Sequence, residues 1–221
     1  MRFRLSLLTT WLLVGLGVAA SKPHTVALGP WLVLKASAGT PGHEVKIRPL
    51  LVDGQTREYT TGQRHDVTDR VFVIRRADRV NDSLPEESGK PLRWTWQLGG
   101  WISVNRMTGH ISRLNLPAFD PQTSEASWYR DYAAYCGVSD DGSQGYMMVF
   151  QVGRRKPVLK KEQAGLSCAA PQWERDPIRV TFATSDGAKV NFVIRRAGAE
   201  MLPEENAPEE NSTPSDNENQ P

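Results

Sequence analysis

The chain has 221 residues, with 27 lysines and arginines, 25 aspartates and glutamates, and a formal net charge of +2. Only two cysteines and four histidines are present. These are too few metal ligands for a fold stabilised by structural zinc or for a histidine-rich metal site. A chain of this length is long enough for one domain with its own hydrophobic core.

The N-terminus predicts a cleaved secretory signal peptide over residues 1–20. Arg2 and Arg4 precede the apolar run Leu5–Val18, and Val18-Ala19-Ala20 ends in small residues at a cleavage site. The alternative is a membrane anchor, but the run is at the short end for crossing a ~30 Å hydrocarbon core and no second apolar stretch follows it. We therefore expect an exported protein, periplasmic or extracellular, with no transmembrane span after signal cleavage.

Residues 203–221 predict a disordered acidic tail, because they contain no large apolar residue and no base. The predicted body, residues 21–202, excludes Arg2 and Arg4 and the six acids of the tail. It therefore keeps 25 of the 27 bases and 19 of the 25 acids, a net charge of +6. We expect a single β-rich domain over these residues. Its charge is compatible with an anionic surface such as lipid head groups or acidic polysaccharide, or with ordinary scattered surface bases; the exported location argues against nucleic acid.

Short segments of alternating or β-branched residues recur along the body between turn signals. In chain order they are Trp31–Lys35, Val45–Leu51, Arg93–Gln97, Trp101–Asn105, His110–Leu116, Tyr132–Val138, Tyr146–Val152, Ile178–Ala183 and Val190–Arg195. The turn signals are Asp53-Gly54, Gly99-Gly100, Thr108-Gly109, Asp140-Asp141-Gly142 and Asp186-Gly187. This pattern predicts a mainly β fold, an antiparallel sandwich or barrel of short hairpins, with a small propeller-like arrangement as the alternative.

One stretch of the body, Ser127–Gly137, is compatible with two kinds of secondary structure. Ser127 suits the start of a helix and Gly137 its end, whereas the tyrosines between them suit a strand.

Within this stretch lies Cys136, and the second cysteine is Cys168, with no C-x-x-C pair. Because an isolated pair in an oxidising compartment usually forms a disulfide, we predict a Cys136–Cys168 bridge, with two buried free thiols as the alternative.

The hexamer FVIRRA occurs twice, at Phe72–Ala77 and at Phe192–Ala197. In both copies Phe and Ile alternate with Val and the first Arg, as on a β-strand. Both copies also follow a segment that begins with Ile-Arg and contains Asp-Gly. A decayed duplication of one strand–turn–strand unit and two strands of similar sequence both account for this.

Motifs of known catalytic chemistry are missing. The sequence contains neither a G-x-S-x-G elbow nor a phosphate-binding glycine loop, and His43-Glu44 lacks the second histidine of a zinc-protease helix. His65-Asp66 with Asp69 is more typical of a polar loop than of a cation site. We therefore predict no catalytic residue, no metal and no cofactor.

Aromatic residues are the richest chemical feature of the chain, and most are expected in the core. Trp128 and Tyr129 are predicted to be exposed, because Arg130 and Asp131 follow them in a loop-like segment. Exposed rings of this kind stack on sugars or fill a hydrophobic groove of a partner. These four residues are therefore predicted to bind a ligand.

The densest positive cluster is Gly153–Lys161, GRRKPVLKK. From it we add Lys160 to the predicted ligand site, as a contact for an anion. The alternative is an edge strand protected by charge and by Pro157.

The stretches SWYRDYAAYCGVSDDG and GRRKPVLKK, together with HDVTDR and LPEES, resemble an uncharacterised family of exported bacterial proteins. The resemblance extends over most of the body. It implies an exported bacterial protein and no particular activity.

These observations favour an exported, non-enzymatic β-domain that binds a ligand or a protein partner in the cell envelope, such as a glycan or an anionic surface. A competing hypothesis is a hydrolase of envelope or extracellular carbohydrate that uses Asp131, Asp140 or Glu125 as acid and base. That mechanism needs two carboxyl groups ~5–10 Å apart in a cleft lined by aromatic residues. A third hypothesis is a structural component of the envelope.

Overall fold

The computed structural model describes residues 23–35, 44–81, 83, 91–92, 94–163, 165–166, 168–184, 187–195 and 198–202. The predicted signal peptide and the predicted acidic tail lie outside these residues. Every regular element within them is a strand, and every strand pair is antiparallel. The predicted fold class is therefore confirmed. Over this described part of the chain, no helix has the length and apolar character of a membrane span.

The first sheet, here called the curled sheet, contains seven strands in the order β1-β3-β4-β5-β6-β7, with β2 beside β3. They are β1 (Val26–Leu28), β2 (Leu32–Lys35), β3 (Glu44–Val52), β4 (Gln55–Asp66), β5 (Val71–Asn81), β6 (Trp94–Asn105) and β7 (Ile111–Leu114). The sheet bends around its own core, which includes Leu50, Phe72, Ile74 and Ile102. The backbone N–H of His24 donates to the carbonyl of Met107 over 3.2 Å, so the start of the sheet meets the turn between β6 and β7.

The middle sheet has the order β11-β10-β9-β8. Its strands are β8 (Ser127–Tyr129), β9 (Tyr132–Val138), β10 (Gly145–Gln151) and β11 (Leu159–Gln163). Successive residues of β9 and β10 face opposite neighbours: Ala134 and Met147 pack toward the outer sheet, and Tyr135 and Met148 toward the curled sheet. Burial on both faces explains why these two strands are almost continuously apolar instead of alternating with polar residues.

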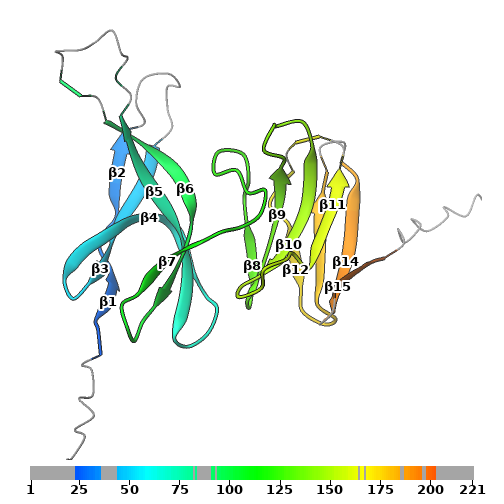
Figure 1. The fold of residues 1–221 in the computed structure, drawn as a ribbon, viewed down its shortest axis with the longest axis horizontal. Coiled ribbons are helices and arrows are strands. Elements are labelled where there is room, and N and C mark those ends of the chain that lie inside the picture. Colours follow the sequence, from blue (N-terminus) through cyan, green and yellow to red (C-terminus); the bar gives the residue numbers. More distant parts are fainter. Residues whose placement is uncertain are drawn as a thin grey trace, which may run out of the picture.

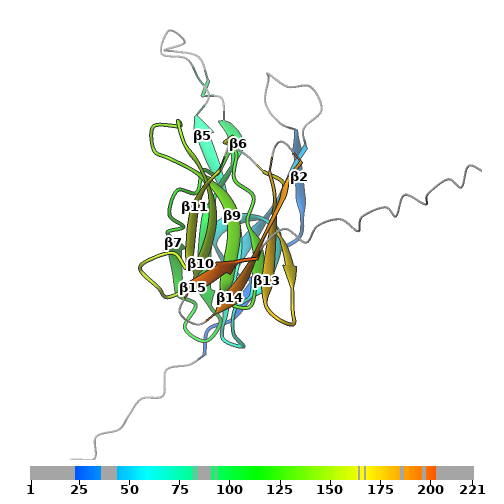
Figure 2. The same cartoon turned by 90° about the vertical axis from the view of Figure 1, so that its right-hand side faces the viewer.

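The outer sheet has the order β12-β13-β14-β15. Its strands are β12 (Gln172–Glu174), β13 (Arg179–Ala183), β14 (Lys189–Arg195) and β15 (Gly198–Met201). Phe182 and Phe192 meet edge to face at 5.9 Å and pack against the middle sheet. Figures 1 and 2 show the resulting order of layers, with the curled sheet on one side of the middle sheet and the outer sheet on the other. The small propeller-like alternative is wrong, because the sheets stack instead of radiating.

The structure corrects one local prediction, adds a strand that was not predicted, and decides between two alternatives for a third segment. Gly99-Gly100 does not interrupt a strand, because β6 runs through it with a shift of register opposite β5. The 12-residue strand β4 was not predicted at all, since most of its residues are polar and exposed. Ser127–Gly137 is not a helix but the two strands β8 and β9, joined by a tight turn in which Arg130 has a positive φ of 52°.

The two FVIRRA segments lie at different places in the topology. Phe72 and Ile74 lie on β5, and the Ile-Arg segment before them lies on β3, which pairs with β4 rather than with β5. In the second copy β13, which carries Arg179, pairs directly with β14. Arg196 and Ala197 lie outside the described residues. The pairing thus differs between the two copies, which favours two strands of similar sequence over a duplicated hairpin, and in both copies the Phe and Ile face a core.

Candidate functional site

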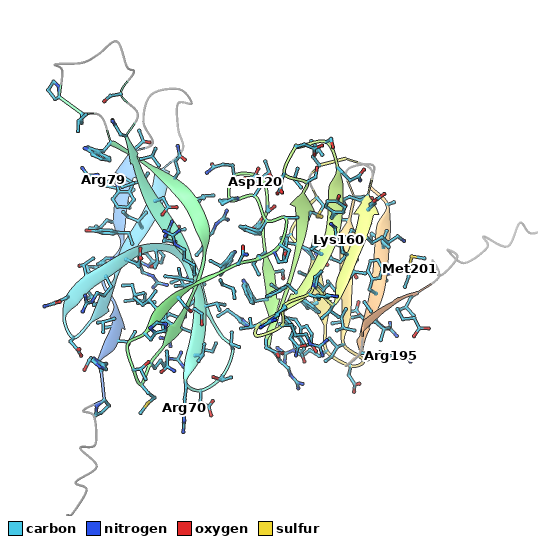
Figure 3. All side chains as sticks on the ribbon, viewed as in Figure 1. Arg70, Arg79, Asp120, Lys160, Arg195 and Met201 are labelled. Atoms are coloured by element: carbon cyan, nitrogen blue, oxygen red, sulfur yellow. A yellow bond between two sulfur atoms is a disulfide. The ribbon has the colours of Figure 1, made fainter. Side chains whose placement is uncertain are left out.

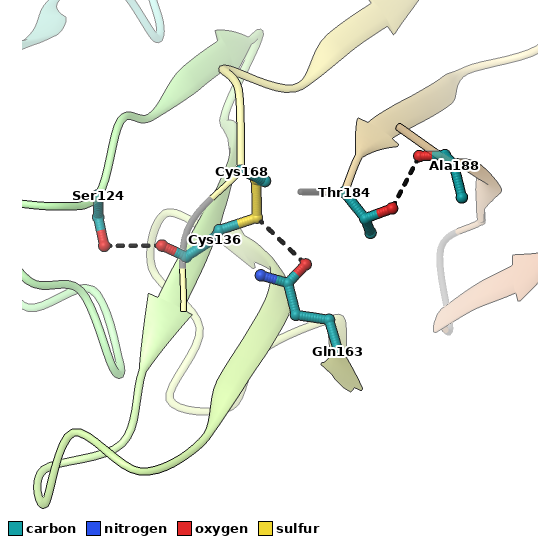
Figure 4. Close-up of a disulfide and its surroundings, with 6 residues drawn as sticks. All are labelled: Ser124, Cys136, Gln163, Cys168, Thr184 and Ala188. Atoms are coloured by element: carbon teal, nitrogen blue, oxygen red, sulfur yellow. Dashed lines mark hydrogen bonds between the residues drawn. A yellow bond between two sulfur atoms is a disulfide. The ribbon is translucent and has the colours of Figure 1, made fainter. Parts of the chain in front are cut away.

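The predicted disulfide is confirmed. Cys136 on β9 and Cys168, just before β12, are bridged with a Cα–Cα distance of 5.9 Å (Figure 4). The bridge ties the middle sheet to the segment that leads into the outer sheet. On the other side of β9, the Ser124 hydroxyl donates to the carbonyl of Cys136 over 2.7 Å. Cys136 therefore fixes two neighbouring segments at once.

Trp128 and Tyr129 do not line one site, because adjacent residues of a strand point to opposite faces. Trp128 packs into the interface with the curled sheet. The ring of Tyr129 instead stacks on Trp173 of the outer sheet, at 5.7 Å between centroids, and Arg130 lies over the Tyr129 ring at 5.5 Å. Tyr129 and Arg130 thus cover the edge between the middle and outer sheets.

Lys160 is also separate from Trp128. It lies on β11, and the order of the middle sheet puts β11 and β8 at opposite edges (Figure 3). Its ammonium group lies 4.1 Å from the ring centroid of Tyr146 on the neighbouring strand. The alternative prediction, an edge strand preceded by Pro157, describes this segment correctly.

Two of the three acids named for a hydrolase lie far apart. Asp131 and Asp140 lie in the turns before and after β9, so a seven-residue strand of roughly 23 Å separates them. Asp131 accepts a hydrogen bond of 2.7 Å from the amide of Gln151. Glu125 is exposed and precedes β8. Asp131 and Asp140 are therefore too far apart to act together as the acid and base of glycoside hydrolysis.

A cleft of about 370 Å³ lies where the curled and middle sheets meet, and we call it the seam cleft. The residues that line it are Thr61, Gly62, Gln63, Arg64, His65, Arg75, Trp101, Glu125, Ala126 and Trp128. A volume of this size falls within the range of small-molecule sites. Of the predicted ligand residues, Trp128 is the one that the structure places here.

A β-bulge in β4, between Thr61 and His65, lines one side of the seam cleft. Thr61 pairs with Arg75 and then His65 pairs with Val73, so residues 62–64 oppose a single residue of β5. Gly62 within this bulge has a positive φ of 68°, a conformation that favours glycine. Bulges of this kind re-aim side chains and are common beside binding sites. Here the bulge brings His65 to β8.

Three rings form the aromatic part of the cleft. The His65 ring stacks on Trp128 at 5.8 Å, and Trp101 meets Trp128 edge to face at 5.0 Å. His65 Nε2 lies 2.7 Å from the carbonyl oxygen of Arg130. Because a carbonyl only accepts, Nε2 carries the proton, and Nδ1 of the neutral ring is an acceptor.

The two indoles each leave a donor without a partner. The Nε1–H groups of Trp101 and Trp128 are buried, and neither donates to any acceptor within the described residues. A buried polar group without a hydrogen bond is rare in folded proteins and usually has a functional or structural explanation. Both of these donors belong to residues that line the same cleft.

Arg75 is a charged residue that lines the cleft. Its Nε donates to the carbonyl of Gly99 over 3.3 Å, and its Nη2 donates to the carbonyl of Pro121, which ties β5 to the loop before β8. Burial lowers the pKa of this guanidinium, and the nearby Glu125 carboxylate acts in the opposite direction. Arg64 also lines the cleft, so its charged side chains are the two bases Arg64 and Arg75 and the one acid Glu125.

Sequence reasoning identified Trp128 but missed His65, Arg75 and Trp101. His65 was assigned to a polar loop, and Arg75 was placed on a predicted strand without a role in a site. Their partners are distant in sequence: the carbonyl of Arg130 for His65 and that of Pro121 for Arg75. No local pattern in the chain signals these contacts.

A second cleft, of about 540 Å³, lies between the segment Asn115–Asp120 and the turn that joins β9 to β10. Its acids are engaged in local turns: Asp120 accepts from the backbone N–H of Gln122 over 2.7 Å. Across the described residues, no three His, Cys, Asp or Glu side chains gather as metal ligands would. The seam cleft is therefore the better candidate.

Comparison of the chain with models of protein families, with curated proteins and with solved structures finds no match. The geometry of the seam cleft is therefore the basis for a proposed function.

Proposed function

We propose that this protein is an exported, non-enzymatic β-domain that binds a small ligand in the seam cleft. The observation that carries the proposal is a cleft of small-molecule size at the junction of two sheets, lined by the rings of His65, Trp101 and Trp128 and by charged side chains. Aromatic rings supply apolar contact area to a small ligand, and the few polar groups among them orient it. The Cys136–Cys168 bridge is compatible with an oxidising, exported location.

The first test is a thermal-shift screen on residues 21–221, the form that cleavage after Ala20 leaves. The screen contains neutral sugars, acidic sugars, muropeptides, lipid head groups and divalent cations. Binding to the folded state alone raises the melting temperature, because it adds RT ln(1 + [L]/Kd) to the free energy of unfolding. A reproducible shift that grows with the concentration of one class of compound supports the proposal.

The variant Trp128→Phe tests whether the ligand binds in the seam cleft, because it replaces the indole that lines the cleft with a smaller ring. Trp31→Phe is the matched control, since Trp31 is exposed outside the cleft. We expect Trp128→Phe to weaken binding about tenfold and the control to leave it unchanged. Equal binding by both variants would place any ligand elsewhere, and no shift with any compound would contradict the proposed function.

A further inference from the structure

A positive cluster, which we call the basic edge, follows the outermost strand of the middle sheet. Its members lie on β11 and in the segment before it, and they are Arg155, Lys156, Lys160 and Lys161. β11 is the last strand of that sheet, and no described strand pairs with it on the side away from β10. Arg155, Lys156 and Lys160 are exposed, and none of them forms an ion pair with a described residue. The basic edge therefore carries positive charges that no described acid pairs.

The acids of the neighbouring strands do not balance the basic edge. Glu162 on β11 and Glu200 on β15 are the acids that these two strands carry. Glu200 is already paired with Arg195, over 2.9 Å. Of the described acids on these strands, Glu162 alone remains for four bases, so the region keeps a net positive charge.

The described chain ends beside this basic edge. Met201 is the last residue of β15 (Figure 3), and its Sδ atom lies 2.8 Å from Nζ of Lys161. The backbone N–H of Leu202 donates to the carbonyl of Asn191 over 2.9 Å, which holds the last described residue on β14. Residues 203–221 follow directly and contain six acids and no base. An acidic segment thus starts next to a basic strand.

The spacing of the acids matches the spacing of the bases. The tetrapeptide PEEN occurs twice, which places Glu204-Glu205 and Glu209-Glu210 five positions apart. The base pairs Arg155-Lys156 and Lys160-Lys161 are also five positions apart. Five residues span at most ~17 Å in either segment. A chain that turns back along the basic edge can therefore bring each pair of acids to one pair of bases.

We infer that residues 203–221 bind the basic edge of their own chain. The first acid pair lies beside Lys160 and Lys161, and the second beside Arg155 and Lys156. Single pairs of exposed charges are weak, but the covalent link keeps the acids near the bases at an effective concentration of roughly millimolar. An anionic partner of the basic edge must displace this segment first. The contact is independent of the seam cleft and of the proposed function.

A nitroxide spin label on Ser212→Cys reports where the segment lies, because it broadens nuclear magnetic resonance signals in its neighbourhood. The sample is residues 21–221 with the Cys136–Cys168 bridge intact. At ~0.01 M salt, where the Debye length is ~30 Å, we expect the backbone amide signals of Arg155 and Lys156 to lose about half of their intensity or more. At ~1 M salt, where the Debye length is ~3 Å, we expect most of that intensity to return.

Lys46 is the internal control, because it is exposed on β3 of the curled sheet. We expect its amide signal to change little between the two salt concentrations. Equal broadening of Lys46 and Arg155, or broadening of Arg155 that salt does not relieve, would overturn the inference.

A full-length variant with neutral PEEN segments separates charge from proximity, and its changes are Glu204→Gln, Glu205→Gln, Glu209→Gln and Glu210→Gln. At low salt, we expect its broadening at Arg155 to fall to the level that the wild-type acids show at high salt. The matched control is Asp216→Asn/Glu218→Gln, which removes two acids beyond the PEEN segments and should keep most of the broadening. Equal broadening in the four-fold variant and the control would overturn the inference.

A mixture of spin-labelled chain with isotope-labelled chain that has no spin label tests whether the contact lies within one chain. The signals of the isotope-labelled chain should stay sharp. Broadening of its Arg155 signal at low salt would assign the acidic segment to the basic edge of a second copy, and would overturn the inference.

Discussion

The imidazole of His65 stacks on the indole of Trp128 with 5.8 Å between ring centroids, although β4 and β8 belong to different sheets. The same imidazole reaches the carbonyl of Arg130 in the turn after β8. One side chain of the β4 bulge thus positions both the aromatic wall of the seam cleft and the turn beside it.

The variant His65→Ala is expected to lower the free energy of unfolding by about 1–2 kcal/mol. It removes one hydrogen bond and one ring contact between sheets. Urea unfolding followed by circular dichroism measures the change. His110→Ala serves as the control, because His110 is exposed in the turn before β7. An effect no larger than that of the control would mean that the contact between sheets does not contribute to stability.

Removing the disulfide is expected to lower the free energy of unfolding by roughly 3–4 kcal/mol. Cys136 and Cys168 are 32 positions apart, and the chain-entropy model gives this value for a loop of that length. The double variant Cys136→Ala/Cys168→Ala should show it in urea unfolding. A reducing agent should lower the midpoint of the wild-type chain and leave that of the double variant unchanged. Equal midpoints for the oxidised wild type and the double variant would contradict the prediction.

Gly145→Ala is expected to lower the free energy of unfolding by about 1–3 kcal/mol, the usual effect of overpacking. A Cβ on Gly145 at the start of β10 would lie 1.9 Å from the carbonyl oxygen of Gly165, so the backbone must move. Gly100→Ala is the matched control in a strand, because a Cβ there meets nothing within 4 Å. We expect the control to change stability by about 0.5 kcal/mol at most. Similar values for the two variants would show that the contact at Gly145 relaxes freely.

A strand can be predicted from the sequence when its burial leaves a pattern in its own residues. It cannot be predicted this way when its conformation depends on pairing with distant strands. Strands such as β9, β10 and β14 were predicted because their apolar residues face a core, and that leaves a local pattern. Strand β4 has no such apolar pattern, because most of its residues are exposed. Its conformation comes from pairing with β3 on one edge and β5 on the other.

The same reasoning explains the candidate site. Trp128 was identified because Arg130 and Asp131 follow it in a segment that resembles a loop. Tyr129 was grouped with it by proximity, and the alternation of the strand then separated the two. His65 and Arg75 enter the cleft through a bulge and through bonds to carbonyls that lie 65 and 46 positions away. Such contacts depend on the arrangement of the sheets and have no signature in the neighbouring residues.

Acid is expected to destabilise the turn between β9 and β10 through Asp141. A hydrogen bond from the Ser139 hydroxyl, followed by bonds from the backbone N–H and hydroxyl of Ser143, lowers the pKa of this carboxyl from its ordinary value of 3.8 to about 2. Because the folded chain holds the proton less tightly than the unfolded chain, the stabilisation is present above pH 3.8 and is lost as the pH falls toward 2.

A pH titration of the side-chain carboxyl by nuclear magnetic resonance measures this directly. The midpoint for Asp141 should lie near 2 in the wild-type chain and move up toward 3.8 in Ser139→Ala, which removes the largest cause of the shift. Asp141→Asn should reduce the loss of stability between those pH values, whereas Asp140→Asn, which alters the neighbouring exposed carboxyl, should not. A wild-type midpoint at the ordinary value would mean that the turn does not hold its hydrogen bonds in solution.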